Sequence, residues 1–154
     1  MAISRADPSG SDFPFLDGEG WNETSPRNPS YNCVAWAAWD NHRWWQPNPP
    51  RDGYWPLGAD DDSSVGAFER AFASLGYSPS EGGELEDGFE KIAFYAIGGE
   101  VTHAARQLPS GRWTSKLGRN IDIEHTLRGL EGPTYGTVVR FLKRRRTGIA
   151  GSAR

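Results

Sequence analysis

Residues 29–45 read PSYNCVAWAAWDNHRWW, and we expect this stretch to decide the fold. It contains the only cysteine of the chain, Cys33, and four of its seven tryptophans. Asn28 or Ser30 is suited to cap a helix here, and Pro29 suits the first helical position, where its missing N–H costs nothing. The stretch therefore predicts a helix from about residue 30 to about residue 45, which prolines at 47, 49 and 50 then end.

Cys33 falls in the first turn of this predicted helix. The free N–H groups and the positive end of the helix dipole favour a thiolate over a thiol at such a position. Several families of cysteine hydrolase hold their nucleophile in this way, and many inert buried cysteines occupy the same place. The rest of the chain must distinguish the two.

The composition indicates one compact domain with many loops. The chain has 154 residues, of which 36% are hydrophobic and 12% aromatic, with 19 glycines and 11 prolines. This balance predicts a loop-rich α+β domain. The single cysteine excludes an intramolecular disulfide, and the first twelve residues lack the apolar run of a signal peptide. No segment is apolar enough to span a bilayer, so we expect a cytoplasmic protein without a membrane partner.

The charge is unevenly distributed along the chain, whose net charge is −3. From Arg140 onward there are six basic residues and no acidic one, so the remainder is acidic. A short basic end on an acidic body is typical of a solvated terminus. Nucleic acid is therefore not an expected partner.

The predicted elements follow the order helix, helix, antiparallel strands. Residues 1–20 predict a flexible segment, 21–146 a single domain and 147–154 a flexible tail. Apolar residues at helical spacing predict a second helix from about 62 or 63 to 75. The strand patterns lie at 90–96, 100–107, 112–116 and 135–142, with a hairpin turn at Gly98-Gly99 and a short helical piece at 123–130.

The chain has three histidines that could partner the thiol. His42 lies nine residues after Cys33 on the same predicted helix, about 13 Å along its axis, and is too far away to be the base. His103 lies on a predicted strand among small residues, which leave room for another element to pack closely. An imidazole beside a thiol can take its proton and give a thiolate–imidazolium pair. We expect Cys33 to be the nucleophile and His103 the base, the alternative being a strand histidine bonded to backbone.

His103 needs an acceptor that fixes its tautomer. Ser115 on the neighbouring predicted strand competes for this role with Asp122, Glu124 and His125 beyond it. Asp122 is a good choice because a carboxylate also stabilises imidazolium, but it is also suited to cap the helical piece at 123–130. His125 would give a Cys-His-His arrangement. The residues alone leave this choice open.

These motifs carry two resemblances. A cysteine at a helix N-terminus, then a histidine on an antiparallel meander and a polar orienter, resembles the papain-like fold hydrolases, of which the NlpC/P60 and CHAP groups are nearest in type. This resemblance implies a papain-like α+β fold, with N-terminal helices packed on an antiparallel β-meander, Cys33 as nucleophile and His103 as base. Five segments resemble an uncharacterised bacterial family over about 21–146: YNCVAWA at 31–37, THAARQ at 102–107, WTSKLG at 113–118, IEH at 123–125 and YG at 135–136.

The oxyanion donor departs from the papain-like pattern. Papain-like peptidases usually have a glutamine upstream of the cysteine, whereas the only glutamines here, Gln46 and Gln107, lie downstream. The expected donors are the backbone N–H of Cys33 and the side chain of Asn28 or Asn32. The predicted activity is hydrolysis or transfer of a peptide, amide or ester through a thioester, with no cofactor or metal. Such a domain would serve as a housekeeping peptidase or amidase, or as a bacterial toxin or effector that meets a protein partner.

Two other function classes stay open. The first is a non-catalytic binding module, in which the tryptophans at 36, 39, 44, 45 and 55 stack on sugars, bases or a partner. Trp44, at the predicted helix end, would roof a groove and is the expected substrate-binding residue. The second is a metal-dependent hydrolase that uses His103, Asp122 and His125.

Overall fold

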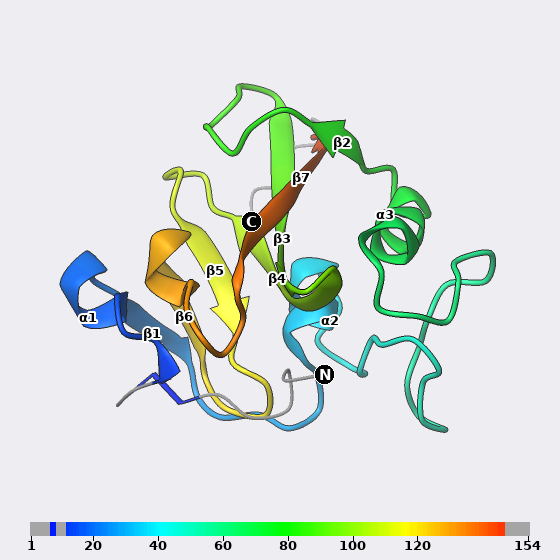
Figure 1. The fold of residues 1–154 in the computed structure, drawn as a ribbon, viewed down its shortest axis with the longest axis horizontal. Coiled ribbons are helices and arrows are strands. Elements are labelled where there is room, and N and C mark those ends of the chain that lie inside the picture. Colours follow the sequence, from blue (N-terminus) through cyan, green and yellow to red (C-terminus); the bar gives the residue numbers. More distant parts are fainter. Residues whose placement is uncertain (1–6, 9–11, 147–154) are drawn as a thin grey trace.

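The computed structural model describes residues 7–8 and 12–146. This part of the chain has an α+β architecture: one antiparallel sheet of seven strands, with short helices on its faces (Figure 1). The strand order is β1-β6-β5-β4-β3-β7-β2. The elements are α1 (Leu16–Glu19), β1 (Asn22–Ser25), α2 (Cys33–Ala37), α3 (Val65–Ala73), β2 (Ser78–Ser80), β3 (Phe89–Ile97), β4 (Glu100–Gln107), β5 (Trp113–Lys116), β6 (Asp122–His125), a 3₁₀ turn (Arg128–Leu130) and β7 (Thr137–Arg145).

The hairpin of β3 and β4 forms the centre of the sheet, as the sequence predicts. Gly98 and Gly99 join the two strands with φ values of +58° and +84°, which glycine adopts without strain. Most side chains of both strands are buried, because the two faces of the hairpin are covered. The strands predicted at 100–107 and 112–116 are confirmed as β4 and β5.

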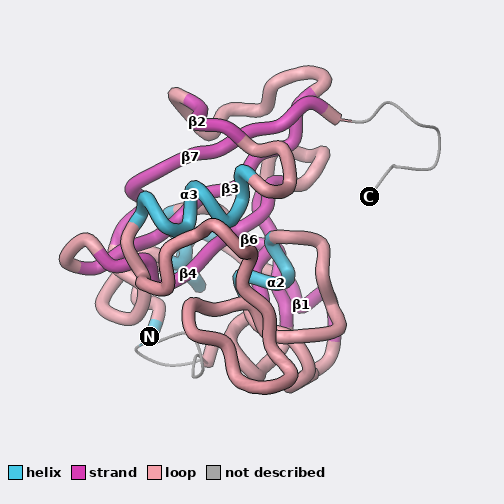
Figure 2. The backbone as a smooth tube through the Cα atoms, turned by 90° about the vertical axis from the view of Figure 1, so that its right-hand side faces the viewer, coloured by secondary structure: helices cyan, strands magenta, loops and turns pink. Residues whose placement is uncertain are grey.

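Two apolar clusters lie on the two faces of this sheet. The first joins α2 and α3 to β3, and in it the rings of Phe68 and Phe72 meet Phe94 edge-on at 5.6 and 5.3 Å. The second contains α1, the 3₁₀ turn and Tyr95 of β3. In the side view, α3 and the long loop that precedes it lie in front of the strands (Figure 2). Neighbouring residues of a strand therefore serve different clusters, as Phe94 and Tyr95 do.

The prediction of a helix over 30–45 is wrong in length. α2 ends at Ala37, and Trp39 adopts a φ of +66°. The N–H of Asp40 donates back to the Ala35 carbonyl at 2.8 Å, which closes the helix around a left-handed residue. The Asp40 carboxylate then accepts the indole N–H of Trp45 at 2.9 Å and turns the chain away from the helix axis. These local contacts, each between residues five apart in the chain, end the helix ten residues before the prolines at 47–50.

The predicted cap is also wrong. Asn32 caps α2, because its Oδ1 accepts the Ala35 N–H at 3.1 Å, whereas Asn28 only bonds the N–H of Ser30 in the preceding turn. Cys33 is consequently the first residue of the helix. Its predicted place in the first turn is confirmed.

The segment predicted as helical at 123–130 is a strand followed by a turn. β6 pairs with β5 on one side and with β1 on the other, so its backbone groups are satisfied only in an extended chain. Only Arg128–Leu130 is helical, as a single 3₁₀ turn. The sequence does not predict β1 or β2, because NETS and SPS are polar and do not alternate.

The remaining predictions concern the ends and the second helix. α3 confirms that helix, with Ser64 as its cap. Phe13 and Leu16 are buried, so part of the segment predicted as flexible is packed against the body. β7 continues beyond 142 to Arg145, and the predicted tail at 147–154 lies outside the described residues. Within 7–8 and 12–146, no helix is long and apolar enough to cross a bilayer.

Candidate active site

Asn32 fixes the position of Cys33 at the start of α2. Besides capping the helix, its Oδ1 accepts the Trp45 N–H at 3.1 Å and its Nδ2 donates to the Trp45 carbonyl at 2.9 Å. The segment that follows the helix is thereby tied back to its first turn. The Asn32 side chain, predicted as an oxyanion donor, is thus used to hold the backbone in this structure.

The Cys33 thiol is fully buried. Burial raises the pKa of this thiol to about 12. Hydrogen bonds to the sulfur from the backbone N–H groups of Ala104, Val34 and Cys33 itself lower the pKa, and so does the positive charge of Lys116. Desolvation outweighs the helix terminus here. The resting sulfur is therefore a protonated thiol, surrounded by donors that would stabilise a thiolate once charge develops.

His103 is held by a chain of hydrogen bonds across β4, β5 and β6. Its Nε2 lies 2.8 Å from Ser115 Oγ, and this oxygen lies 2.7 Å from His125 Nε2. His125 Nδ1 lies 2.7 Å from the carbonyl oxygen of Thr126. All three side chains are fully buried, so the chain is shielded from water.

The direction of these hydrogen bonds assigns the tautomers. A carbonyl only accepts, so His125 Nδ1 carries a proton and donates to Thr126. Burial lowers the pKa of His125 to about 4 and the pKa of His103 well below 6.5, so both rings are neutral. His125 Nε2 therefore accepts the Ser115 hydroxyl proton, and Ser115 accepts the Nε2–H of His103. The Nδ1 of His103 is left as a bare lone pair.

That nitrogen has no hydrogen-bond partner among the described residues. The imidazole is stacked on the Tyr135 ring at 4.0 Å with 14° between the planes, and it meets the Tyr95 ring edge-on at 5.3 Å. Packing and the Ser115 contact together leave the ring little freedom to rotate. His103 is thus an oriented neutral base with a free acceptor.

The Cys33 sulfur and the His103 ring lie at neighbouring residues of β4 but on opposite faces of the sheet, and they are not bonded to each other. The sulfur receives the N–H of Ala104, the residue directly after His103. Ala104 belongs to the cluster that contains Cys33, whereas the His103 ring lies against Tyr95 and Tyr135 of the other. Neither nitrogen of His103 has Cys33 as a hydrogen-bond partner.

Asp122 does not orient His103. Its carboxylate accepts the hydroxyl of Thr24 and, at 3.1 Å, the hydroxyl of Tyr31. Among the competing orienters, Ser115 contacts the imidazole directly, and His125 contacts it through Ser115. Glu124 instead forms an ion pair with Arg112 at 2.8 Å. The chain from the imidazole thus joins the two histidines through a serine, and Cys33 is not part of it.

Lys116 lies close to the Cys33 thiol, a position that the sequence does not indicate. It is fully buried opposite Asp122 in the β5–β6 register, its Nζ donates to the Gly118 carbonyl at 2.6 Å, and it lies 4.8 Å from the centre of the Tyr31 ring. Burial lowers its pKa to about 8, against the raising effects of Asp122 and Cys33. The sequence predicts that Lys116 lies on a strand. Only the strand register shows that this part of the strand faces the helix.

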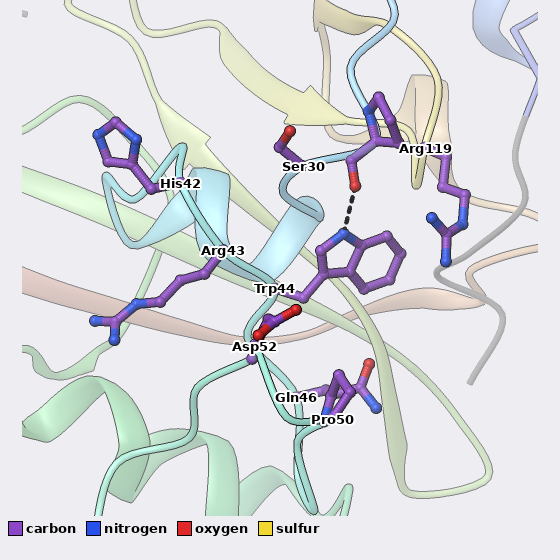
Figure 3. Close-up of a pocket in the computed structure, with 10 residues that line it drawn as sticks. Ser30, His42, Arg43, Trp44, Gln46, Pro50, Asp52 and Arg119 are labelled. Carbon is purple, nitrogen blue, oxygen red and sulfur yellow. Dashed lines mark hydrogen bonds between the residues drawn. The ribbon is translucent and has the colours of Figure 1, made fainter.

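A pocket of about 440 Å³ opens beside the start of α2. Trp44 stands at its centre, with Arg119 on one side and Asp52 on the other (Figure 3). The Trp44 indole N–H donates to the Pro29 carbonyl at 2.7 Å, which fixes the ring. His42 also lines this pocket and is exposed, away from the thiol. Trp44 thus lines a pocket, but it does not stand at the helix end, and neither Cys33 nor His103 lines this pocket.

A metal centre finds no support in the arrangement of the candidate ligands. Within the part of the chain that the structure describes, no group of three or more His, Cys, Asp and Glu side chains is placed to hold a metal ion. His103 and His125 are both engaged by Ser115, whereas Asp122 bonds Thr24 and Tyr31.

Comparison with known proteins gives a family without an assigned reaction. One family matches residues 22–143, and its description is "Domain of unknown function (DUF7689)". No curated protein and no solved structure matches the chain. The family match covers the sheet, both site histidines and the start of α2. The chain therefore belongs to the family of domains of unknown function DUF7689.

Proposed function

We propose that this domain is a cysteine-dependent acyl-transfer enzyme of the peptidase or amidase type. Cys33 is the nucleophile, His103 is the base, and Ser115 with His125 positions His103. The observation that carries the proposal is the chain from Thr126 to His103, which leaves one buried imidazole nitrogen bare beside the strand segment that contacts the thiol. A buried acceptor without a partner is costly, and a base that awaits a proton explains it.

The proposed reaction balances protons at Nδ1 of His103. This nitrogen takes the thiol proton while the sulfur attacks the carbonyl carbon of an amide or ester. The C–N or C–O bond then breaks, the leaving amine or alcohol takes the proton from His103, and a thioester stays on Cys33. Water then gives a proton to His103, attacks the thioester and releases the acid with the thiol restored. An amine in place of water makes the enzyme a transferase.

The surroundings support this role for the thiol in two ways. Backbone N–H groups at the start of α2 and at Ala104 already point at the sulfur, and the Lys116 ammonium lies close enough to favour its negative charge. Cys33 and His103 are fully buried and lie against clusters on opposite faces of the sheet. The proposal therefore requires an opening at the start of α2 that admits substrate and a rearrangement that brings the imidazole to the thiol.

The proposal extends to a papain-like fold. Its support is the order of elements, with the cysteine on the first residue of α2 and the histidine on a later antiparallel strand. Soluble peptides, amides or esters are the substrates that such chemistry takes. A housekeeping role and a toxin or effector role are compatible with it alike.

The second candidate function is a binding module without catalysis. The complete burial of Cys33, which raises the pKa of the thiol to about 12, favours this alternative. In that case the pocket around Trp44 is the functional surface and the buried polar chain is structural.

Acylation by p-nitrophenyl acetate distinguishes the two. We expect release of p-nitrophenolate together with a single acetyl adduct on Cys33 in the intact mass, and neither in Cys33→Ala. His103→Ala should slow acylation by about a hundredfold or more, the usual contribution of a general base. Ser115→Ala should also slow it, whereas Ser78→Ala, an exposed serine of β2, should not. If Cys33→Ala hydrolysed the ester at the wild-type rate and the wild-type thiol carried no adduct, the enzyme proposal would be refuted and the binding module would be supported.

A further inference from the structure

The pocket beside α2 presents an aromatic ring between two unpaired charges. Arg43 is engaged by Asp40 at 2.8 Å and by the Tyr54 ring, but Arg119 forms no ion pair within the described residues. Its guanidinium carbon lies 4.8 Å from the centre of the Trp44 ring. Asp52, across the ring from Arg119, likewise forms no ion pair with any described residue (Figure 3). The two charges do not neutralise each other.

This arrangement matches a particular ligand chemistry. A guanidinium binds a carboxylate through two parallel hydrogen bonds, and an indole face packs on flat or apolar groups. A volume of about 440 Å³ is within the range of small-molecule sites. The carboxylate of Asp52 repels negative charge in the pocket. A doubly charged phosphate is therefore disfavoured, whereas a ligand with one carboxylate followed by a neutral amide is tolerated.

We propose that the pocket binds the C-terminal residue of a peptide, with the carboxylate on Arg119 and the side chain against Trp44. The assignment of this peptide as substrate or product rests on the proposed function, whereas its binding does not. Trp44 is rigid because Pro29 accepts its indole N–H at 2.7 Å, and the next residue, Trp45, is bonded to Asn32 directly before Cys33. The segment that carries Trp44 is thereby tied to the start of α2, although Cys33 itself does not line the pocket.

Calorimetric titration of the full chain with N-acetyl-tyrosine and N-acetyl-tyrosine amide tests this inference. The two probes differ only in the carboxylate, which the second replaces by an amide. Both contain amide bonds, so the titrations are done in the Cys33→Ala background, where the proposed activity cannot cleave them. We expect the acid to bind at least about tenfold more tightly than the amide, because a charge-assisted contact is lost. Arg119→Gln should remove that preference and Trp44→Leu should weaken both probes, while Arg145→Gln, at the end of β7, should change neither.

Several outcomes would overturn the inference. These are equal affinity for acid and amide, an unchanged preference in Arg119→Gln, the absence of binding at millimolar acid, and tighter binding of inorganic phosphate than of the acid. A nuclear magnetic resonance shift of the Trp44 indole N–H provides a second readout if a variant fails to fold. Because the binding titrations are done without the Cys33 thiol, a failed acylation experiment and a failed binding experiment remain distinguishable.

Discussion

Replacing His125 should make the protein more tolerant of mild acid. In the folded state this ring is neutral because burial lowers its pKa from 6.5 to about 4, and its two nitrogens bond Ser115 and Thr126. In the unfolded chain the ring regains its ordinary pKa and takes up a proton below about pH 6.5. The unfolded state then binds more protons than the folded state, so stability must fall as the pH falls through this range. The loss stops growing below the folded pKa, where both states are protonated.

The size of the effect follows from the shift. One pKa unit corresponds to about 1.4 kcal/mol, and between about pH 7 and about pH 5 the unfolded ring becomes almost fully protonated while the folded ring stays neutral. His125 alone should therefore account for about 2 kcal/mol of lost stability over that interval. His103, whose pKa is lowered further by burial and by His125, adds to the loss in the same direction.

Urea unfolding of the wild type and of His125→Asn at the two pH values measures the effect. The wild type should lose the larger amount, and the variant should lose about 2 kcal/mol less, whatever its stability at neutral pH. The glutamine of His125→Gln puts its amide near the position of the imidazole Nε2. This variant replaces His125→Asn in the experiment if the asparagine variant does not fold. His42→Gln, at an exposed histidine, should behave as the wild type does. Equal losses in the wild type and both His125 variants would refute the assignment of a neutral buried ring.

Three further changes should affect stability in directions that urea unfolding can check. Ser115→Ala should cost about 1–3 kcal/mol because it leaves two buried imidazole nitrogens unbonded, and a variant as stable as the wild type would contradict the hydrogen-bonded chain. Asn32→Ala should cost about 2 kcal/mol or more through the lost cap and the lost Trp45 contacts, whereas Asn28→Ala, at the predicted but unused cap, should cost far less. Gly136→Ala should be much more damaging than Gly88→Ala, although both glycines have a φ near +80°, because a Cβ at 136 would collide with the Ala96 carbonyl while open space surrounds residue 88. The strain at residue 88 alone should cost about 1 kcal/mol, and equal costs at the two positions would contradict the packing of the β7 start against β3.

The helix around Cys33 shows how far local signals extend. Asn, Ser and Pro before the cysteine correctly indicate a helix start, and they place the thiol in a first turn. They do not choose between Asn28, Ser30 and Asn32, because each can bond a free N–H and the difference lies in the Trp45 segment that Asn32 also holds. The end of the helix is likewise not predicted by the local pattern. The Asp40 carboxylate accepts hydrogen bonds from residues that follow it, and the Asp40 N–H closes the helix at Ala35, although the helical pattern continues to Trp45.

The candidate site shows a similar limit. The sequence singles out Cys33, His103, Asp122 and His125, with Ser115 and Glu124 as further candidate orienters, because their types are the ones that acyl transfer needs. It cannot rank the orienters of His103, since that requires the register between β4, β5 and β6, in which Ser115 lies between two rings on one face while Lys116 and Asp122 pair next to it. The sequence likewise does not show that Lys116 is buried close enough to Cys33 to affect the pKa of its thiol.

The sequence by itself determines the composition of the domain, the β3–β4 hairpin, α3, and the placement of a single thiol at a helix start. Each of these depends on residues that lie close together along the chain, so their spacing carries the information. The tertiary structure alone decides which faces these residues share, because one position along a strand moves a side chain to the other side of the sheet. That alternation places the imidazole of His103 with Ser115 and Tyr135 and the Cys33 sulfur at the backbone of Ala104, and it sets the gap that the proposed reaction must close.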